Sequence, residues 1–331
     1  MTTTADRILA GEEMRNHRAF LAWASAVGVL LLLALLPLWN PDSFLVYIAT
    51  VVFLYLVGGF GMHLIMRTGL IPLGQAAFVG IGGYVSALLT TRFGISFWLA
   101  FAAAGMAAGL VAAVVGPIIL RLRGVYFVLI TFTLGEIVRL VFVEWSAITG
   151  GSDGISRIPS PSAFFSSPFH YYYLALAVAA ASLVFSLRLM KSEFGQAMDA
   201  IGESETLAAA TGVPVYRVKI TVFIIGCVLA GLQGSLTAHF IRFIAPQSFS
   251  FSESLNFLVM NVIGGTHSLW GPIIGTIFIV ALPELLRQWV ELQWILYGIA
   301  LICVMRFFPG GLAELGTKLR DMAVARMRAG S

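Results

Sequence analysis

The sequence predicts an all-α, polytopic transmembrane helical bundle, and three observations support this fold class. Hydrophobic residues make up 59% of the 331 residues and charged residues only 11%, whereas soluble domains contain roughly 45–50% and 25%. The apolar residues are gathered in runs close to the ~20 residues that a helix needs to cross a bilayer. Most of the 20 Lys and Arg residues lie between or beyond those runs, as they do in membrane proteins with basic cytoplasmic loops.

The chain is expected to cross the membrane about ten times, within a range of roughly eight to ten. The run at 251–266 decides the count, because it is short, contains Asn256 and Asn261 and ends in a Gly-Gly pair, as a re-entrant segment could. A crossing is favoured because it keeps the basic C-terminal tail on the cytoplasmic side. The expected spans are 19–39, 43–66, 70–91, 95–120, 124–145, 169–190, 218–240, 251–266, 269–286 and 292–309.

The placement of basic residues divides the chain into three parts. Residues 1–18 and 313–331 are expected to be cytoplasmic N-terminal and C-terminal tails, and residues 19–312 to be the transmembrane domain. With both tails inside, most Lys and Arg residues face the cytoplasm, as the positive-inside rule requires. The first apolar run is too long for a signal-peptide core and lacks a small-residue cleavage site, so an uncleaved anchor is expected.

A polar stretch at 191–217 interrupts the apolar runs and is expected to be a cytoplasmic loop. Its Ala-rich interior predicts one or two short helices that end at Gly212 and Pro214. It has no groups placed for chemistry of its own, so we expect it to dock a second protein. Basic residues flank it on both sides, which indicates the cytoplasm: Arg188, Lys191, Arg217 and Lys219.

One Gly-rich segment within the apolar runs is a candidate for a substrate route. The Gly-rich segment 69–84 contains Pro72 and Gln75, and broken helices often line such routes. A packing face between helices is the alternative. Small residues at helical spacing, such as Gly105 with Gly109, predict close packing within the chain or against a partner.

Glu136 and Arg139 are ionisable residues inside an expected span, where each costs about 2.5–3.5 kcal/mol at the centre. They are three residues apart, so they share a helical face and can neutralise each other. They could form only an internal pair, or a polar patch beside the route. The residues expected along the route are Gln75, Gly82, Gly83, Thr133, Glu136, Arg139 and Asn261.

Several functions are excluded by missing motifs. The chain has no GxxxxGK[ST] phosphate loop, no GxSxG motif and no zinc-binding motif, so no catalytic residue or metal ligand is assigned. Cys227 and Cys303 lie in apolar runs and form no disulfide framework. The five histidines show no ligand spacing and are expected at interfaces or in loops. Basic charge placed for orientation argues against nucleic-acid binding. Because the chain has no phosphate loop of its own, the energy for any transport must come from an ion gradient or from a separate ATPase.

Six segments occur in order across residues 69 to 312 and together resemble the LivM-type permease subunit of branched-chain amino acid ABC transporters. The polar stretch 191–217 lies where that family also has a loop between crossings. The six segments are GLIPLGQAAFVGIGGY (69–84), RLRGVYF (121–127), TLGEIVR (133–139), TGGSDGI (149–155), SLWGP (268–272) and FPGGL (308–312).

The resemblance implies a subunit of a larger importer in the bacterial inner membrane. Its partners would be a LivH-type permease, two cytoplasmic ATPase subunits that use ATP, and an extracytoplasmic solute-binding protein, while this chain would bind no cofactor itself. The outer loop 145–168 would dock the binding protein, although a plain connection is equally expected. The polar stretch would be the ATPase-coupling loop, with Glu193, Gly195, Ala197, Ile201, Glu205, Ala208, Ala209 and Gly212 as its site residues.

The chain departs from the resembled pattern at several positions. Family members often carry basic residues at the positions of Gln196, Asp199 and Gly202, and commonly carry His at Gln75 and Gly at His267. These departures leave the solute open among branched-chain amino acids, other amino acids, urea or short amides, and aromatic acids. The alternative from another class is an ion-coupled secondary transporter that uses Glu136, and a membrane enzyme is disfavoured by the missing catalytic groups.

Overall fold

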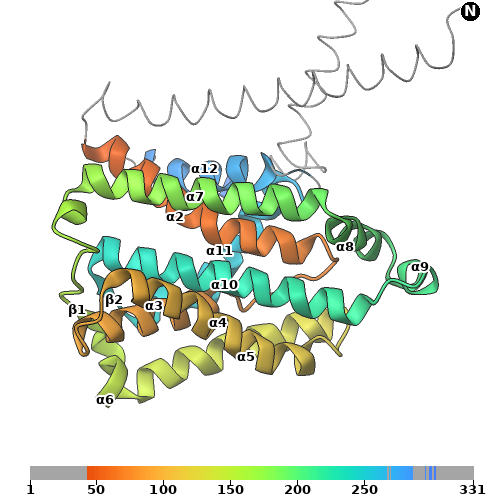
Figure 1. Cartoon of the computed structure of the whole chain (residues 1–331), viewed down its shortest axis with the longest axis horizontal. Coiled ribbons are helices and arrows are strands. Elements are labelled where there is room, and N and C mark those ends of the chain that lie inside the picture. Colours follow the sequence, from red (N-terminus) through yellow and green to blue (C-terminus); the bar gives the residue numbers. More distant parts are fainter. Residues whose placement is uncertain are drawn as a thin grey trace, which may run out of the picture. The chain divides into compact units, whose positions relative to one another are not determined.

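The computed structural model describes residues 43–266, 268, 270–285, 295, 298, 299 and 302. The chain divides into two compact units, 1–47 and 48–331, and the helical bundle described here belongs to the second unit (Figure 1). The expected spans 19–39 and 292–309, both tails and His267 lie outside the described residues. The count of about ten spans therefore stays a prediction.

The described residues are helical apart from short turns and one two-stranded sheet. Three 3-10 turns lie at Gly151–Asp153, Phe164–Ser166 and Pro246–Phe249. The strands are β1 (Ile155–Ser156) and β2 (Phe243–Ile244). The helices are α2 (Ser43–Met66), α3 (Gln75–Thr91), α4 (Phe97–Ile119), α5 (Val125–Glu144), α6 (Ser146–Thr149), α7 (Pro168–Lys191), α8 (Glu193–Glu203), α9 (Glu205–Ala210), α10 (Val215–Ile241), α11 (Phe251–Gly264) and α12 (Trp270–Leu285).

Five of the described helices, α2, α4, α5, α7 and α10, are long and apolar enough to cross a membrane. They coincide within a few residues with the expected spans 43–66, 95–120, 124–145, 169–190 and 218–240. The agreement follows from uninterrupted apolar runs, in which only an internally hydrogen-bonded helix satisfies the backbone. The expectation of an all-α membrane protein is confirmed to this extent.

One end of the bundle, the α8–α9 end, gathers the loop after α2, the α4–α5 loop, and helices α8 and α9 (Figure 1). Arg67 Nε donates a hydrogen bond of 2.7 Å to Asp199 Oδ1. Arg123 Nη2 lies 3.5 Å from Glu205 Oε1. Two loops that are distant in sequence are thus joined to the polar stretch by ion pairs.

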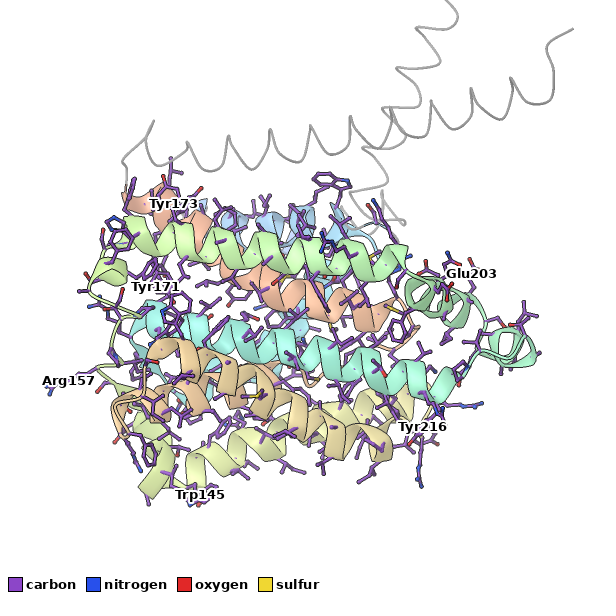
Figure 2. The ribbon with its side chains drawn as sticks, viewed as in Figure 1. Trp145, Arg157, Tyr171, Tyr173, Glu203 and Tyr216 are labelled. Atoms are coloured by element: carbon purple, nitrogen blue, oxygen red, sulfur yellow. The ribbon has the colours of Figure 1, made fainter. Side chains whose placement is uncertain are left out.

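The opposite end, the β1–β2 end, joins the loop after α10 to the long connection before α7. Ile155 pairs antiparallel with Ile244. Arg92 Nη2, just after α3, donates a hydrogen bond of 2.8 Å to the Ala147 carbonyl in α6. Figure 2 labels Glu203 and Tyr216 at the α8–α9 end, and Trp145 and Arg157 at the β1–β2 end. The loops expected on opposite sides of a membrane therefore lie at opposite ends.

The expected span 70–91 is wrong at its start, because the helix begins only at Gln75. Gly69 adopts φ +74°, and residues 69–74 continue as non-helical chain. Leu73 N donates to Thr131 Oγ1 at 3.0 Å, and a Cβ on Gly74 would overlap the Thr131 carbonyl oxygen. With 17 residues, α3 is only about 25 Å long, shorter than the ~30 Å hydrocarbon core.

Helix α11 is shorter still, with 14 residues or about 21 Å, and its first turn meets that of α3 inside the bundle. Ala76 N donates to Ser254 Oγ at 3.1 Å, and both residues are buried. The rings of Phe251 and Phe132 lie 5.0 Å apart, which places both helix starts beside α5. Non-helical backbone at this depth is tolerated because protein surrounds it.

Helix α10 packs chiefly on α3 and α4, and glycines allow the backbones to approach. A Cβ on Gly82 would overlap the backbone of Gly231, and one on Gly234 would overlap the Val79 carbonyl oxygen. A Cβ on Gly231 would lie 2.6 Å from the Ala108 Cβ of α4. Small residues therefore fix the distances within this three-helix core.

We expect Gly82→Ala to destabilise the protein by about 1–3 kcal/mol, because the new methyl group forces α3 and α10 apart. The measurement is thermal unfolding of the detergent-solubilised chain. Gly59→Ala in α2 is the control, since its Cβ would meet Thr276 Oγ1 at an ordinary 3.5 Å. Equal stability of the two variants would contradict the role of this contact.

Candidate functional site

Three amide side chains are buried in the bundle interior and are here termed the amide cluster: Gln75, Gln233 and Asn261. Asn261 Nδ2 donates to the Phe257 and Gly59 carbonyls at 2.9 and 3.3 Å. Gln233 Oε1 and Asn261 Oδ1 accept no hydrogen bond from the described residues. Buried acceptors without partners are rare and costly, so the cluster is a site that packing alone does not explain.

The members of the amide cluster approach neighbouring positions on α2 and α10. A Cβ on Gly58 would overlap Gln233 Oε1, and Asn261 contacts the next residue, Gly59. Gln75 Nε2 donates to the Gly226 carbonyl at 3.4 Å, about two helical turns along α10 from Gln233. The structure thus buries two predicted route residues, Gln75 and Asn261, and adds Gln233, whose only sequence signal is a lone amide in an apolar run.

Gly82 and Gly83, also predicted along the route, lie between α3 and α10. Gly82 is set against the Gly231 backbone, and Gly83 against the Ile244 side chain and the Gly234 carbonyl. The packing face that the sequence left open as an alternative describes their surroundings. A role in the route stays a prediction for both.

The predicted route residues of α5 lie apart from the amide cluster. Arg139 Nε donates to Glu136 Oε2 at 2.8 Å, and their side chains are 28% and 29% exposed. Thr133 is exposed and donates to the Leu129 carbonyl at 2.9 Å. Only 17% of the most apolar stretch of α5 is buried within the chain. The expected Glu136–Arg139 pair is confirmed, and this polar face points away from the core of the chain.

Helices α8 and α9 project together at one end of the bundle and are here termed the finger. Each begins with a serine N-cap, because Ser192 Oγ accepts from Gly195 N and Ser204 Oγ accepts from Leu207 N. The prediction of one or two short helices in the polar stretch is confirmed, and two are present. The chain turns after α9 at Gly212, where φ is +89°, before α10 begins.

The predicted coupling residues divide into a buried side and an exposed side of the finger. Glu205 is half-buried, and Lys219 Nζ donates to its Oε2 at 2.8 Å, so it joins α9 to α10. Leu207 is 65% exposed; it was missed because a single Leu among alanines looks like a core position. Gly195, Ile201 and Ala208 are buried, Ala197 is intermediate, and Glu193, Ala209 and Gly212 are exposed.

Two departures from the resembled pattern have a structural explanation in the mounting of the finger. Asp199 accepts the hydrogen bond of Arg67, and a basic residue there would repel that guanidinium. A Cβ on Gly202 would overlap the Arg67 carbonyl oxygen, so no side chain fits without a shift. Gln196 is exposed and has no such constraint.

A buried hydrogen-bond chain connects the bundle to the outer connection at the β1–β2 end. His239 Nδ1 lies 2.6 Å from the Pro159 carbonyl, which can only accept, so Nδ1 carries the hydrogen. Nε2 therefore accepts from Ser86 Oγ at 2.9 Å, and Ser86 accepts from Ser235 Oγ at 2.7 Å. The expectation that histidines lie at interfaces or in loops is wrong for the buried His239.

Long apolar helices, buried amide side chains and a polar finger at one end are the features of a helical membrane protein. The family described as "Branched-chain amino acid transport system / permease component" matches residues 44–305. The chain belongs to this family, and it is a permease subunit of an ABC importer.

Similar proteins whose names state a function agree with this assignment. The chain is 33% identical over 295 residues to the "High-affinity branched-chain amino acid transport system permease protein LivM" of Escherichia coli (strain K12), covering 81% of this chain and 69% of the relative. It is 32% identical to the protein of the same description from Salmonella typhimurium, with the same coverage. The "Autoinducer 2 import system permease protein LsrC" of Klebsiella pneumoniae is 27% identical over 50% of this chain and 48% of its own length. No solved structure matches the chain significantly.

We expect Asp199→Asn to loosen α8 from the bundle, because the amide cannot form the ion pair with Arg67. For a half-exposed pair worth about 1 kcal/mol, amide hydrogen exchange in 193–203 should rise roughly fivefold. Glu203→Gln is the matched control, since it removes the same charge from an exposed position of the same helix. Exchange that is equal in both variants would refute the mounting role of Asp199.

Proposed function

We propose that this permease forms one half of the translocation path of an importer for branched-chain or related amino acids. A second, LivH-type permease would supply the other half, and the protein would be a multi-pass protein of the bacterial inner membrane. The two LivM relatives are named as branched-chain amino acid permeases, which supports this class of solute. The LsrC relative is a reason to include other small polar solutes in the test.

The proposal of a path shared between two permeases rests on the polar face of α5, which points away from the core of this chain. Thr133, Glu136 and Arg139 lie on α5, the least buried of the five long apolar helices among the described residues. Ionisable groups that face lipid are costly, whereas groups at a protein interface or a hydrated path are tolerated. A second permease against α5 would give these side chains such a surrounding.

The amide cluster lies apart from the α5 face, in the interior of the chain, and would join the path only when the helices around it separate. Its unused acceptors, Gln233 Oε1 and Asn261 Oδ1, could bind an ammonium group or water when the helices separate. Gln75 Nε2, at the start of α3, is a side-chain donor that could turn from the Gly226 carbonyl to a solute carboxylate. An α-amino acid carries both charges, so the donor and acceptor set fits this solute class.

The finger would couple this movement to ATP hydrolysis in two partner ATPases, with the α8–α9 end in the cytoplasm. Leu207 is an exposed apolar side chain on α9 that a docked ATPase would cover. The finger is held by ion pairs to the loop after α2 and to α10. This chain would bind no ATP itself.

The outer connection 145–168 would dock the solute-binding protein at the β1–β2 end. It is held against the bundle at several points, including Arg92 Nη2 to Ala147 and Arg242 Nη2 to the Ser166 carbonyl at 3.1 Å. Trp145 and Phe164 are exposed on it. A fixed surface with exposed aromatic groups is suited to a protein partner.

The first test is to solubilise native membranes gently, capture the chain by a C-terminal tag and identify what accompanies it by mass spectrometry. We expect a second, homologous permease and ATPase subunits with phosphate loops. Leu207→Asp should lose the ATPases and keep the second permease, because Asp is tolerated in the first turn of a helix but cannot fill an apolar contact. Leu207→Met is the control and should keep both.

Capture of the chain alone, together with solute uptake by the reconstituted chain in an ion gradient, would overturn the proposed energy source. Retention of the ATPases by Leu207→Asp would instead overturn only the assignment of the docking contact. The two results are distinguishable because the first concerns every partner and the second only the variant.

Glu136→Gln should reduce solute uptake but not abolish it, because ATP supplies the energy and the substitution only leaves Arg139 unpaired beside the path. The measurement is the initial rate of uptake of radiolabelled leucine by cells or by the reconstituted importer. Glu136→Gln combined with Arg139→Gln should recover part of the loss, since no unpaired charge remains. Complete loss in both variants, with normal amounts of assembled complex, would indicate obligatory ion coupling through Glu136.

A further inference from the structure

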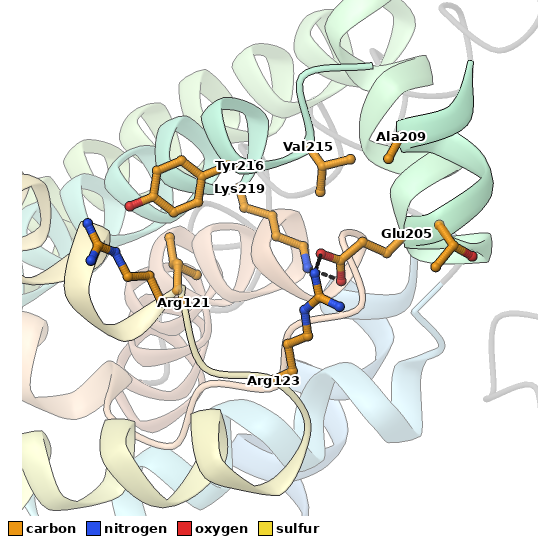
Figure 3. Close-up of a pocket in the computed structure, with 9 residues that line it drawn as sticks. Arg121, Arg123, Glu205, Ala209, Val215, Tyr216 and Lys219 are labelled. Carbon is orange, nitrogen blue, oxygen red and sulfur yellow. Dashed lines mark hydrogen bonds and ion pairs between the residues drawn. The ribbon is translucent and has the colours of Figure 1, made fainter. Parts of the chain in front are cut away.

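A pocket of about 360 Å³ opens at the α8–α9 end, between α9, the start of α10 and the α4–α5 loop. Its volume lies within the ~300–1,000 Å³ usual for small-molecule sites. Figure 3 shows Arg123 and Lys219 converging on Glu205, while Arg121 projects separately from the same loop. Neither the amide cluster nor the polar face of α5 contributes to it.

The charges of the pocket are not balanced. Its lining contains three cationic side chains, Arg121, Arg123 and Lys219, and one acidic side chain, Glu205, which leaves an excess of two positive charges. Lys219 Nζ is bonded to Glu205 at 2.8 Å, whereas Arg123 lies at a looser 3.5 Å. Arg121 has no ion-pair partner among the described residues. The pocket therefore has unused capacity for an anion.

The side chains around the pocket are of the kinds expected at a boundary between hydrocarbon and water. Val125 and Tyr126 follow the basic loop directly and are 70% and 72% exposed. On α4, exposed apolar side chains recur every four residues up to the pocket, so they share one face of the helix: Met106, Leu110, Val114 and Ile118. Such a face is suited to acyl chains, and the polar finger lies directly beyond it.

We propose that this pocket binds the phosphate of an anionic phospholipid of the cytoplasmic leaflet, with Arg121 and Arg123 as its ligands. Guanidinium groups match phosphate geometry through paired N–H donors. Basic pockets between helices on the cytoplasmic side are suited to such headgroups. The acyl chains lie along the apolar face of α4, and Tyr216 stands at the headgroup level, where aromatic residues concentrate.

The exposed apolar face distinguishes a lipid from the other possible occupants. An acidic side chain of an ATPase would use the arginines but would leave Met106 to Ile118 uncovered, and free phosphate would do the same. A phospholipid satisfies both the excess charge and the apolar face in one molecule. The inference rests on the proposed placement of the α8–α9 end in the cytoplasm.

Lipid binding at this position bears directly on the finger. Glu205, Thr206 and Ala209 of α9 form one wall of the pocket, so the headgroup contacts the finger on one side and the α4–α5 loop on the other. The phosphate competes with Glu205 for Arg123, whose ion pair is the looser of the two. Glu205 keeps its bond to Lys219 when the lipid is bound.

The test is a titration of the purified full-length chain in neutral detergent with dioctanoyl phosphatidylglycerol, dioctanoyl phosphatidylcholine and inorganic phosphate. We expect saturable binding of phosphatidylglycerol, and affinity reduced on the order of tenfold or more by Arg121→Gln with Arg123→Gln. Arg188→Gln with Lys191→Gln is the matched control, because it removes two cations from the same end of the bundle outside the pocket. That control should bind like the unaltered chain.

Ala209→Trp provides a second variant that fills the pocket without changing its charge, and it should also weaken phosphatidylglycerol binding. Equal affinity of the arginine variant and the control variant would overturn the proposal. Equal binding of phosphatidylcholine would show that charge is not recognised, and inorganic phosphate binding as tightly as the lipid would show a free-phosphate site; both overturn it. Loss of the ATPases from the arginine variant with unchanged lipid affinity would assign the pocket to that partner. None of these outcomes depends on transport.

Discussion

The contact on which the rest of the bundle depends is the approach of the α3 and α10 backbones at glycine. Where Gly82 meets Gly231 and Gly234 meets the Val79 carbonyl, no side chain separates the helices. The short α3 is therefore enclosed by protein along its length. This enclosure supports residues 69–74 as non-helical chain, in which Leu70, Pro72 and Gly74 are buried while Gly69 and Ile71 are exposed. It also places Gln75 beside α10 and leaves α5 on the outside.

The long helices could be predicted from the sequence because hydropathy and length alone define them. The start of α3 could not, since a run of apolar residues is equally hydrophobic whether it is helical or extended. Gly69 and Pro72 were visible as weak points, but only the bond from Leu73 to Thr131 shows that the chain there is held by another helix.

In the candidate sites, too, contacts between residues close in sequence could be predicted, and contacts between distant residues could not. The Glu136–Arg139 pair followed from its spacing of three residues. The Arg67–Asp199 pair joins residues 132 positions apart, and no local pattern announces it. Gln233 was missed because one amide in an apolar helix is unremarkable until its acceptor is found buried beside Gly58. The departures at Asp199 and Gly202 likewise became explicable only when their common neighbour, Arg67, was in place.

The finger is attached to the bundle at three places rather than one: through Asp199 to the loop after α2, and through Glu205 to both the α4–α5 loop and α10. A segment attached at one point can pivot there, whereas a segment attached at three points moves together with the helices that hold it. A force applied at the tip of α9 is therefore shared among the ends of α2, α4, α5 and α10.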